Sequence, residues 1–173
     1  KGDINDVVKD ELEHNNEFLH KNKTMVILDS LRKQMSNKEN VESFLNKYDF
    51  YNNDFIYINS LMHTENKQNN RKIDKQKLFI GTSSIEQGIT IKNLNNMIIE
   101  PGFEAMNFIQ RIGRVSRGDI DGNVIVAYNE EHLKKKWFRN ILQYAECVEK
   151  TNINDFIKTI LKSEYDENEY NDR

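Results

Sequence analysis

The residues best suited to chemistry lie between Asn107 and Gly118, in the run NFIQRIGRVSRG. In a helix, successive side chains are about 100° apart around the axis, so this run would sort into two faces. One face would carry the polar set Gln110, Gly113, Arg114 and Arg117, and the opposite face the apolar set Phe108, Ile112 and Val115. The spacing therefore predicts a helix over residues 103–117, stopped at Gly118, that buries one side and presents two arginines on the other.

Two guanidinium groups one helical turn apart suit a ligand with several anionic oxygens, because each offers a planar fork of donors. Gly113 lies between the arginines and would let such a ligand approach the backbone closely. A phosphoryl group in transfer is a ligand of this kind, and an arginine that stabilises it contributes on the order of 10³–10⁵ in rate. The alternative is a basic face in contact with solvent. The position of the run, directly after a buried apolar strand, favours a ligand site.

A second polar cluster follows another apolar run. Thr82, Ser83 and Ser84 come directly after residues 78–80. Hydroxyls and backbone N–H groups at the end of a strand and the start of a helix can cap that helix or bind phosphate.

The elements that must position these residues alternate in type. Five short runs rich in Ile, Val, Phe or Tyr predict buried strands at residues 24–28, 55–58, 78–80, 97–99 and 124–128. Helical spacing is found between and after them, at residues 31–48, 103–117, 133–148 and 156–161. This alternation predicts an α/β fold with an open, mainly parallel sheet flanked by helices. The single proline, Pro101, is expected to mark the end of the fourth strand.

We expect three parts: a flanking helix at the rim of the sheet (residues 1–21), one α/β domain (22–150), and a C-terminal helix with a polar tail (151–173). The last eleven residues are acidic and polar and are expected to fray. The Asn- and Lys-rich stretch 65–77 is expected to face solvent.

Composition narrows the possible functions. The 173 residues suit one domain, and the net charge of -3 provides no overall positive field, so nucleic acid would have to be held by local groups. The single cysteine, Cys147, excludes an internal disulfide and a Cys-rich zinc site, which favours the reducing cytoplasm. We expect it to be a packed, inert thiol. No run of about 18 apolar residues is present, and we predict neither a membrane span nor a metal site.

The arginine run resembles motif VI of superfamily 2 helicases, QRxGRxGR. The matching residues are Gln110, Arg111, Gly113, Arg114 and Arg117, whereas Ser116 replaces the usual glycine. The resemblance implies a RecA-like domain, the second of two in such enzymes. It also implies that Arg114 and Arg117 reach the γ-phosphate of ATP held by the first domain, with Gln110 and Gly113 near the nucleotide. Arg111 would make a structural or inter-domain ion pair.

Residues 78–91, LFIGTSSIEQGITI, resemble motif V of the same family. The resemblance implies that Thr82, with Ser83 and Ser84, contacts the backbone of single-stranded DNA or RNA. It places Gly88 and Thr90 near the nucleotide. Thr90 departs from the Asp that many members carry. His63 is expected to be a surface or capping histidine, with a functional role as the alternative.

The family's phosphate loop, GxxxxGK[ST], and its Asp-Glu pair at a strand end are missing from these 173 residues. Asp166 to Glu169 lie in the polar tail and follow no strand, so we assign them no function. Both missing motifs belong to the first RecA-like domain. ATP and Mg²⁺ would therefore be bound mainly by that domain, and the isolated chain is expected to be inactive.

Two segments of the chain resemble different helicase subfamilies, so the sequence does not decide between them. The continuation QRIGRVSRGDIDGNVIVAY is similar to the CRISPR-associated helicase-nuclease of type I systems, which would make a CRISPR effector complex a partner. ITIKNLNNMIIEPGF is similar instead to DEAH and viral helicases. A stand-alone, non-catalytic binding or regulatory module with the same fold is a further alternative. A doubly wound flavin- or nucleotide-binding domain is disfavoured, because no glycine follows the first strand at Asp29 to Arg32.

Overall fold

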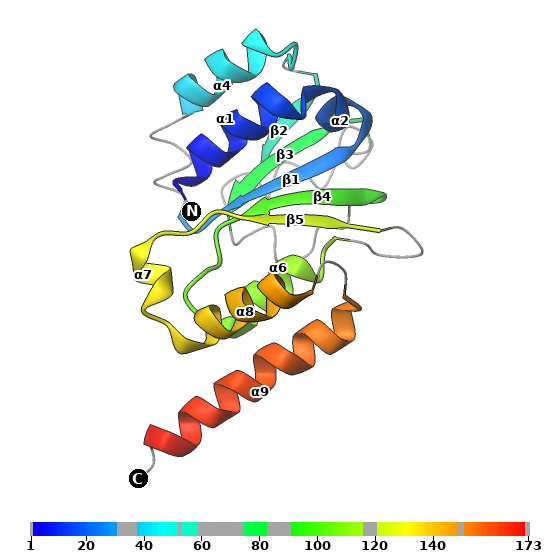
Figure 1. The fold of residues 1–173 in the computed structure, drawn as a ribbon. Helices are drawn as coiled ribbons and strands as arrows, with labels where there is room; N and C mark the ends of the chain where they lie inside the picture. The colour runs from blue at the N-terminus through cyan, green and yellow to red at the C-terminus, as the bar shows by residue number, and fades with distance from the viewer. Residues whose placement is uncertain are drawn as a thin grey trace.

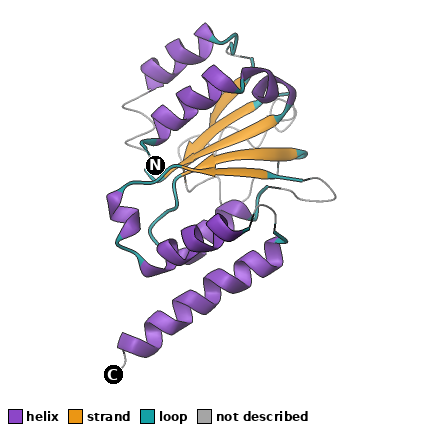
Figure 2. Ribbon diagram, viewed as in Figure 1, coloured by secondary structure: helices purple, strands orange, loops and turns teal. Residues whose placement is uncertain are grey.

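The computed structural model describes residues 2–30, 38–51, 53–58, 75–82, 91–115, 121–148 and 151–171. Within these residues the predicted parallel sheet is confirmed (Figures 1 and 2). Its strands are β1 (Lys23–Leu28), β2 (Phe55–Ile58), β3 (Leu78–Thr82), β4 (Leu94–Ile99) and β5 (Asn123–Val126). They lie in the order β2-β3-β1-β4-β5, and every neighbouring pair is parallel. Because all strands run the same way, their carboxyl ends meet at one edge of the sheet.

Helices cover both faces of this sheet (Figure 1). On one face lie α1 (Ile4–His14), α2 (Asn16–Lys21) and α4 (Lys38–Lys47), and on the other α6 (Ala105–Ile112), α8 (Lys136–Cys147) and α9 (Ile153–Asn171). The short α7 (Glu130–Leu133) follows β5. Side chains alternate along each strand, so β1 sends Met25 and Ile27 to the α6 side and Val26 and Leu28 to the α1 side. Two apolar cores result, one on each face.

The helix expected near the N-terminus is present as α1 and α2. Asp3 caps α1 by accepting a hydrogen bond of 2.9 Å from the backbone N–H of Asn5. Ile4, Val8 and Leu12 recur at helical spacing and are all buried in the core of that face. The helix therefore packs against the face of the sheet, and the prediction that it lies at the rim is wrong.

Of the C-terminal helices, α8 departs from prediction at its end. In α8 the buried side chains are Trp137, Phe138 and Ile141, and α9 adds the fully buried Ile160. Cys147 is the last residue of α8 and is exposed. The expectation of a packed thiol is wrong because Cys147 projects well away from the buried stripe, since residues are about 100° apart. Helix α9 extends to Asn171, and the expected fraying from residue 163 stays a prediction.

Two further predictions fall partly outside the described residues. Of the helix expected at 31–48, the described residues contain α4, from Lys38 to Lys47. Most of the stretch 65–77, with His63 before it, also lies outside.

A polar ladder crosses three strands near their amino ends. Asn96 of β4 is fully buried and donates its amide to the Thr24 hydroxyl of β1 at 3.1 Å. Its carbonyl oxygen accepts from the amide of Asn123 on β5 at 3.3 Å. Because Asn96 is aligned with Thr24 on one side and Asn123 on the other, these bonds favour one register of the strands.

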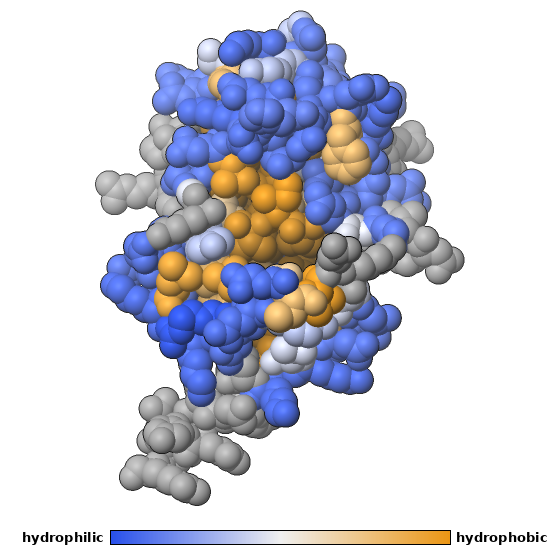
Figure 3. Space-filling model, in the orientation of Figure 1, coloured by the Kyte–Doolittle hydropathy of each residue, from blue (hydrophilic) through white to orange (hydrophobic). Residues whose placement is uncertain are grey.

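The sheet ends at β5, whose outer side is open in the described structure. Figure 3 shows apolar surface across the middle of the side of the molecule that faces the viewer, where Figure 1, in the same orientation, places β5. Val124, Ile125 and Val126 are only partly buried there. Within the described ranges, no helix has both the length and the apolar character needed to cross a membrane.

Candidate functional site

Three strands bring polar residues to the carboxyl edge of the sheet. In the register of the sheet, Leu28 of β1 lies beside Thr82 of β3, and Ile27 of β1 lies beside Ile99 of β4. Asp29 and Glu100 therefore follow neighbouring strands at the same edge, and the backbone N–H of Glu100 donates to the carbonyl of Ile27 at 3.0 Å. This is the edge at which open α/β sheets bind ligands.

Arg111 is buried at this edge and forms an ion pair within the domain. Its side chain is 3% exposed, and its Nη1 lies 2.5 Å from Oδ1 of Asp29 and 2.5 Å from the backbone carbonyl oxygen of Glu100. The prediction that Arg111 makes a structural ion pair is confirmed. The pair ties α6, which follows β4, to the end of β1. Removing one partner of such a buried pair leaves an uncompensated charge, which is strongly destabilising.

Asp29 has partners besides Arg111. Its backbone N–H donates to Oε2 of Glu100 at 2.7 Å, and its second carboxylate oxygen, Oδ2, lies 3.5 Å from Nε2 of His132 in α7. Asp29, Glu100 and His132 are not arranged around a common point as metal ligands are, and no cluster of potential ligands is found among the described residues.

Gly102 forms the turn between β4 and α6. Its φ of 84° lies in the left-handed region, where side chains other than glycine are strained. A Cβ atom at this position would lie 3.0 Å from Cβ of Asn107, a tight contact, and 3.4 Å from Cζ of Arg111, an ordinary van der Waals contact. Glycine is therefore favoured by the backbone conformation of the turn and by the closeness of Asn107.

Helix α6 presents the predicted motif residues, but it is shorter than expected. It spans Ala105 to Ile112 and ends at Gly113, so the helix predicted from 103 to 117 is wrong at both ends within the described residues. Beyond it the backbone N–H groups of Arg114 and Val115 bond three residues back, to Arg111 and Ile112, which tightens the last turn.

The predicted apolar face is present, and the predicted polar face is described only in part. Phe108, Ile112 and Val115 are buried in the core beneath the sheet, as predicted. On the other side Gln110 is exposed, and Arg114 is half-buried directly after the helix. Arg114 is thus carried by the turn that Arg111 anchors.

The remaining predicted site residues are only partly covered. Thr82 closes β3 and is 6% exposed. Arg117, Ser83, Ser84, Gly88 and Thr90 lie outside the described residues, so the structure does not bring them to the site or away from it.

Sequence reasoning missed Asp29 and His132 as parts of this site. A carboxylate directly after a buried strand signals a residue at the carboxyl edge, and that signal could have pointed to Asp29. No comparable signal marks His132, because its role as a partner of Asp29 depends on how α7 folds back against β1.

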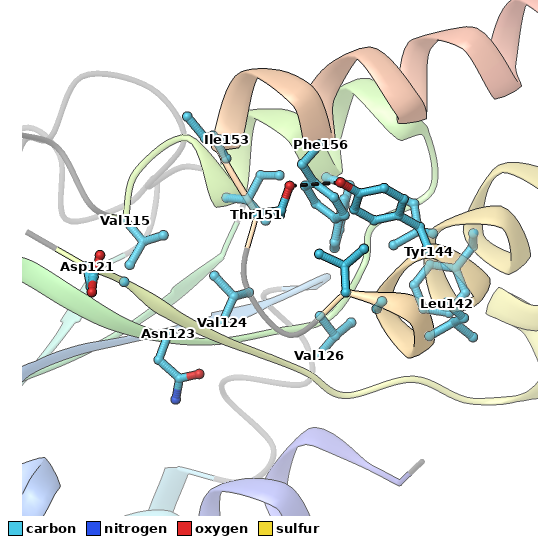
Figure 4. Close-up of a pocket in the computed structure, with 17 residues that line it drawn as sticks. Val115, Asp121, Asn123, Val124, Val126, Leu142, Tyr144, Thr151, Ile153 and Phe156 are labelled. Carbon is cyan, nitrogen blue, oxygen red and sulfur yellow. Dashed lines mark hydrogen bonds between the residues drawn. The ribbon is translucent and has the colours of Figure 1, made fainter.

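A pocket of about 520 Å³ lies elsewhere, between β5 and the helices α6, α8 and α9 (Figure 4). Val124, Val126 and Phe156 contribute to its apolar wall, and Tyr144 and Thr151 hydrogen-bond to one another across 2.8 Å at its side. Asp121, just before β5, lines the pocket as well, so the cavity extends to the amino end of that strand. Arg111 and Arg114 do not line it.

Comparison with known proteins identifies the class of fold. Domain 2 of the DEAD-box helicase Mss116p, bound to an RNA duplex, has a TM-score of 0.62 at 15% identity over 85% of this chain and 58% of that chain. S. cerevisiae Dbp5, bound to RNA and ADP BeF3, has a TM-score of 0.60 at 15% identity, over 90% of this chain and 36% of that chain. Mycobacterium smegmatis helicase Lhr, bound to ssDNA and AMP-PNP, has a TM-score of 0.57 at 15% identity, over 78% of this chain and 19% of that chain. The fold is that of a RecA-like helicase domain.

Residues 5–119 match the family described as helicase conserved C-terminal domain. The chain belongs to this family. It spans from 19% to 58% of the three solved chains above, so it corresponds to a part of each. No curated protein sequence matches it.

Proposed function

We propose that this chain is the C-terminal motor domain of an ATP-dependent helicase or translocase, and that it completes an ATP site on a first RecA-like domain of the same protein. Membership of the helicase C-terminal family supports the motor class. The observation that carries the more specific proposal is the anchored turn at the end of α6. Arg111 is held at the carboxyl edge by Asp29, and Arg114 follows it by three residues and is half-buried.

In the proposed site, Arg114 and Arg117 stabilise the charge that develops on the oxygens of the γ-phosphate. Gln110, Gly113, Gly88 and Thr90 lie close to the nucleotide, and Mg²⁺ is held mainly by the first domain. Guanidinium groups suit this task because their donors are planar and remain charged. A turn fixed in advance also avoids the cost of ordering the arginine when the two domains close.

Nucleic acid is proposed to bind at Thr82, Ser83 and Ser84. The end of a strand offers hydroxyl and backbone donors to the sugar-phosphate chain, which needs no overall positive charge. The solved helicases described above are bound to RNA or ssDNA, which supports a nucleic-acid ligand. Thr82 is buried, so its substitution also perturbs β3, and Ser83 and Ser84 are the cleaner positions to test.

The protein is proposed to act in the cytoplasm, as a DExH-type member of superfamily 2. The continuation after motif VI supports a role in CRISPR interference, with an effector complex as partner. The resemblance of residues 89–103 to DEAH and viral helicases supports a motor without that partner. Co-purification of the protein that carries this domain with or without a CRISPR effector complex distinguishes the two.

The arginine assignment is tested in the protein that carries this domain. Arg114→Lys keeps the charge but removes the planar fork, so we expect the rate of nucleic-acid-stimulated ATP hydrolysis to fall by about 10³. Binding of single-stranded nucleic acid should change little. Arg139→Lys is the matched control, because Arg139 is exposed on α8 and donates to the carbonyls of Leu133 and Lys134. Wild-type turnover in Arg114→Lys would show that the assignment is wrong.

A further inference from the structure

His132 lies outside the part of the chain that matches the helicase family, yet it reaches the cluster that anchors the arginine turn. The family match ends at residue 119, and α7 begins at Glu130. The His132 side chain is 11% exposed and lies beside the ring of Phe138, with 6.0 Å between ring centroids. It is therefore held in place by packing, at the edge of the sheet where β5 ends.

The hydrogen bonds of His132 determine which nitrogen carries the proton. The backbone N–H of Asn129 donates to Nδ1 at 3.1 Å, as part of a capping box in which the Asn129 side chain accepts from the backbone N–H of His132. Nδ1 is thus an acceptor, and the neutral ring carries its proton on Nε2. Nε2 lies 3.5 Å from Oδ2 of Asp29. This is longer than an ordinary hydrogen bond, but both groups are largely buried, where the attraction between an N–H group and a carboxylate is strengthened.

The Asp29 carboxylate is held between two elements. Its Oδ1 accepts from Arg111 of α6, and its Oδ2 faces His132 of α7. Arg111 in turn accepts, through its backbone carbonyl, the bond from the N–H of Arg114 at 3.0 Å. A shift of the carboxylate would therefore move the guanidinium of Arg111 and, with it, the turn that carries Arg114.

We propose that His132 is a positioning residue for the ATPase reaction: through Asp29 and Arg111 it fixes the turn that presents Arg114. The inference rests on the proposed function. It adds α7, which follows the last strand of the sheet, to the elements that set the geometry of the nucleotide site. A misplacement of about 1 Å at a reacting group can cost on the order of a hundredfold in rate, so a contact at this distance from the chemistry can matter.

A matched pair of substitutions separates this role from helix capping. In His132→Asn the side-chain oxygen can replace Nδ1 as the acceptor for Asn129, but the side chain is too short to reach Asp29. In His132→Gln the terminal amide can replace the Nε2 donor, while the capping acceptor is lost. In the protein that carries this domain, we expect kcat for ATP hydrolysis to fall about tenfold to a hundredfold in His132→Asn, with little change in KM. His132→Gln should keep most of the turnover.

Controls distinguish failure of this inference from failure of the proposed function. Lys134→Ala removes only an exposed ion pair with Glu131 on the same helix and should keep turnover. Asp29→Asn should lower kcat, and combining it with His132→Asn should add nothing, because both act through one carboxylate. Wild-type turnover in His132→Asn, or equal losses in the Asn and Gln variants, would overturn the role of His132 while leaving Arg114 in place. Unchanged turnover in Arg114→Lys would overturn both.

Discussion

At the scale of single residues, the buried pair between Arg111 and Asp29 dominates the candidate site. Both side chains are less than a tenth exposed, at 3% and 8%. Asp29→Ala would remove the carboxylate that pairs with the buried Arg111 charge, so we expect the free energy of unfolding to fall by about 3–5 kcal/mol. Asp29→Asn should cost less, because the amide oxygen can still accept from the guanidinium. Urea denaturation of the purified chain measures both.

The control for this prediction is the exposed pair between Asp155 and Lys158 of α9, whose side chains are 67% and 79% exposed. Asp155→Ala should change stability by less than about 1 kcal/mol, because solvent screens the pair. Equal effects of the two aspartate substitutions would contradict a buried, structurally important ion pair.

For Tyr57 on β2, we predict a substitution that does not lower the stability of the protein. Its hydroxyl oxygen is buried and has no hydrogen-bond partner among the described residues, and the ring lies under the Lys38 ammonium at 5.3 Å. Tyr57→Phe keeps the ring and removes the unpaired hydroxyl, so stability near neutral pH should stay the same or rise by about 1 kcal/mol. A loss of more than that, measured by the same denaturation, would mean that the hydroxyl has a partner.

The same substitution has a pH signature. Burial raises the pKa of Tyr57 well above its ordinary value, and the charge of Glu42 adds to the effect. The unfolded chain therefore loses this proton first, so the wild-type protein loses stability as the pH rises past about 10. The gain from Tyr57→Phe should accordingly grow at alkaline pH.

At the scale of elements, α9 contributes to the core despite its polar end. Ile160 is fully buried among the side chains of the α6 and α8 face, and Phe156 packs against Phe108 at 6.3 Å between ring centroids. Ile160→Ala should lower the free energy of unfolding by about 2–5 kcal/mol, because it leaves a cavity. Lys162→Ala, an exposed change on the same helix, should stay within about 0.5 kcal/mol of wild type. A small effect of Ile160→Ala would show that α9 is dispensable for the core.

Element types were predictable from sequence because burial on both faces requires uninterrupted apolar runs in the strands. All five predicted strands are present, with ends that differ by a few residues. The length of α6 was not predictable from periodicity. The backbone tightens at Gly113 into bonds that span three residues, and the side-chain pattern barely changes there.

The candidate site was predictable only in part, for a related reason. The ion pairing of Arg111 followed from the family pattern, but its partner Asp29 is 82 residues away in the chain. Identifying that partner requires the strand order, which places β1 next to β4. Predicting that His132 belongs to the site requires, in addition, the position of α7, which neither the residue spacing nor the family resemblance specifies.

At the scale of the whole molecule, the sheet holds the Arg111–Asp29 pair at its carboxyl edge, but the sequence does not contain the phosphate loop of this helicase class. The sequence has no GxxxxGK[ST] loop to surround the β- and γ-phosphates. The net charge of -3 also gives ATP no general attraction to the domain. Both features agree with the proposed composite site, in which Arg114 and Arg117 would act on a nucleotide supplied by a second lobe.

The purified 173-residue chain should therefore neither hydrolyse ATP nor be stabilised by it. A ligand raises the melting temperature only if it binds the folded state, by an amount that grows with its concentration relative to Kd. We expect Mg²⁺ and ATP at millimolar levels to leave the melting temperature unchanged, whereas the protein with both RecA-like domains should be stabilised and should turn over ATP. Arg114→Lys should reduce that turnover without affecting the isolated chain. Hydrolysis by the isolated chain, sensitive to Arg114→Lys, would contradict a composite site, because the chain would then contain the complete catalytic machinery.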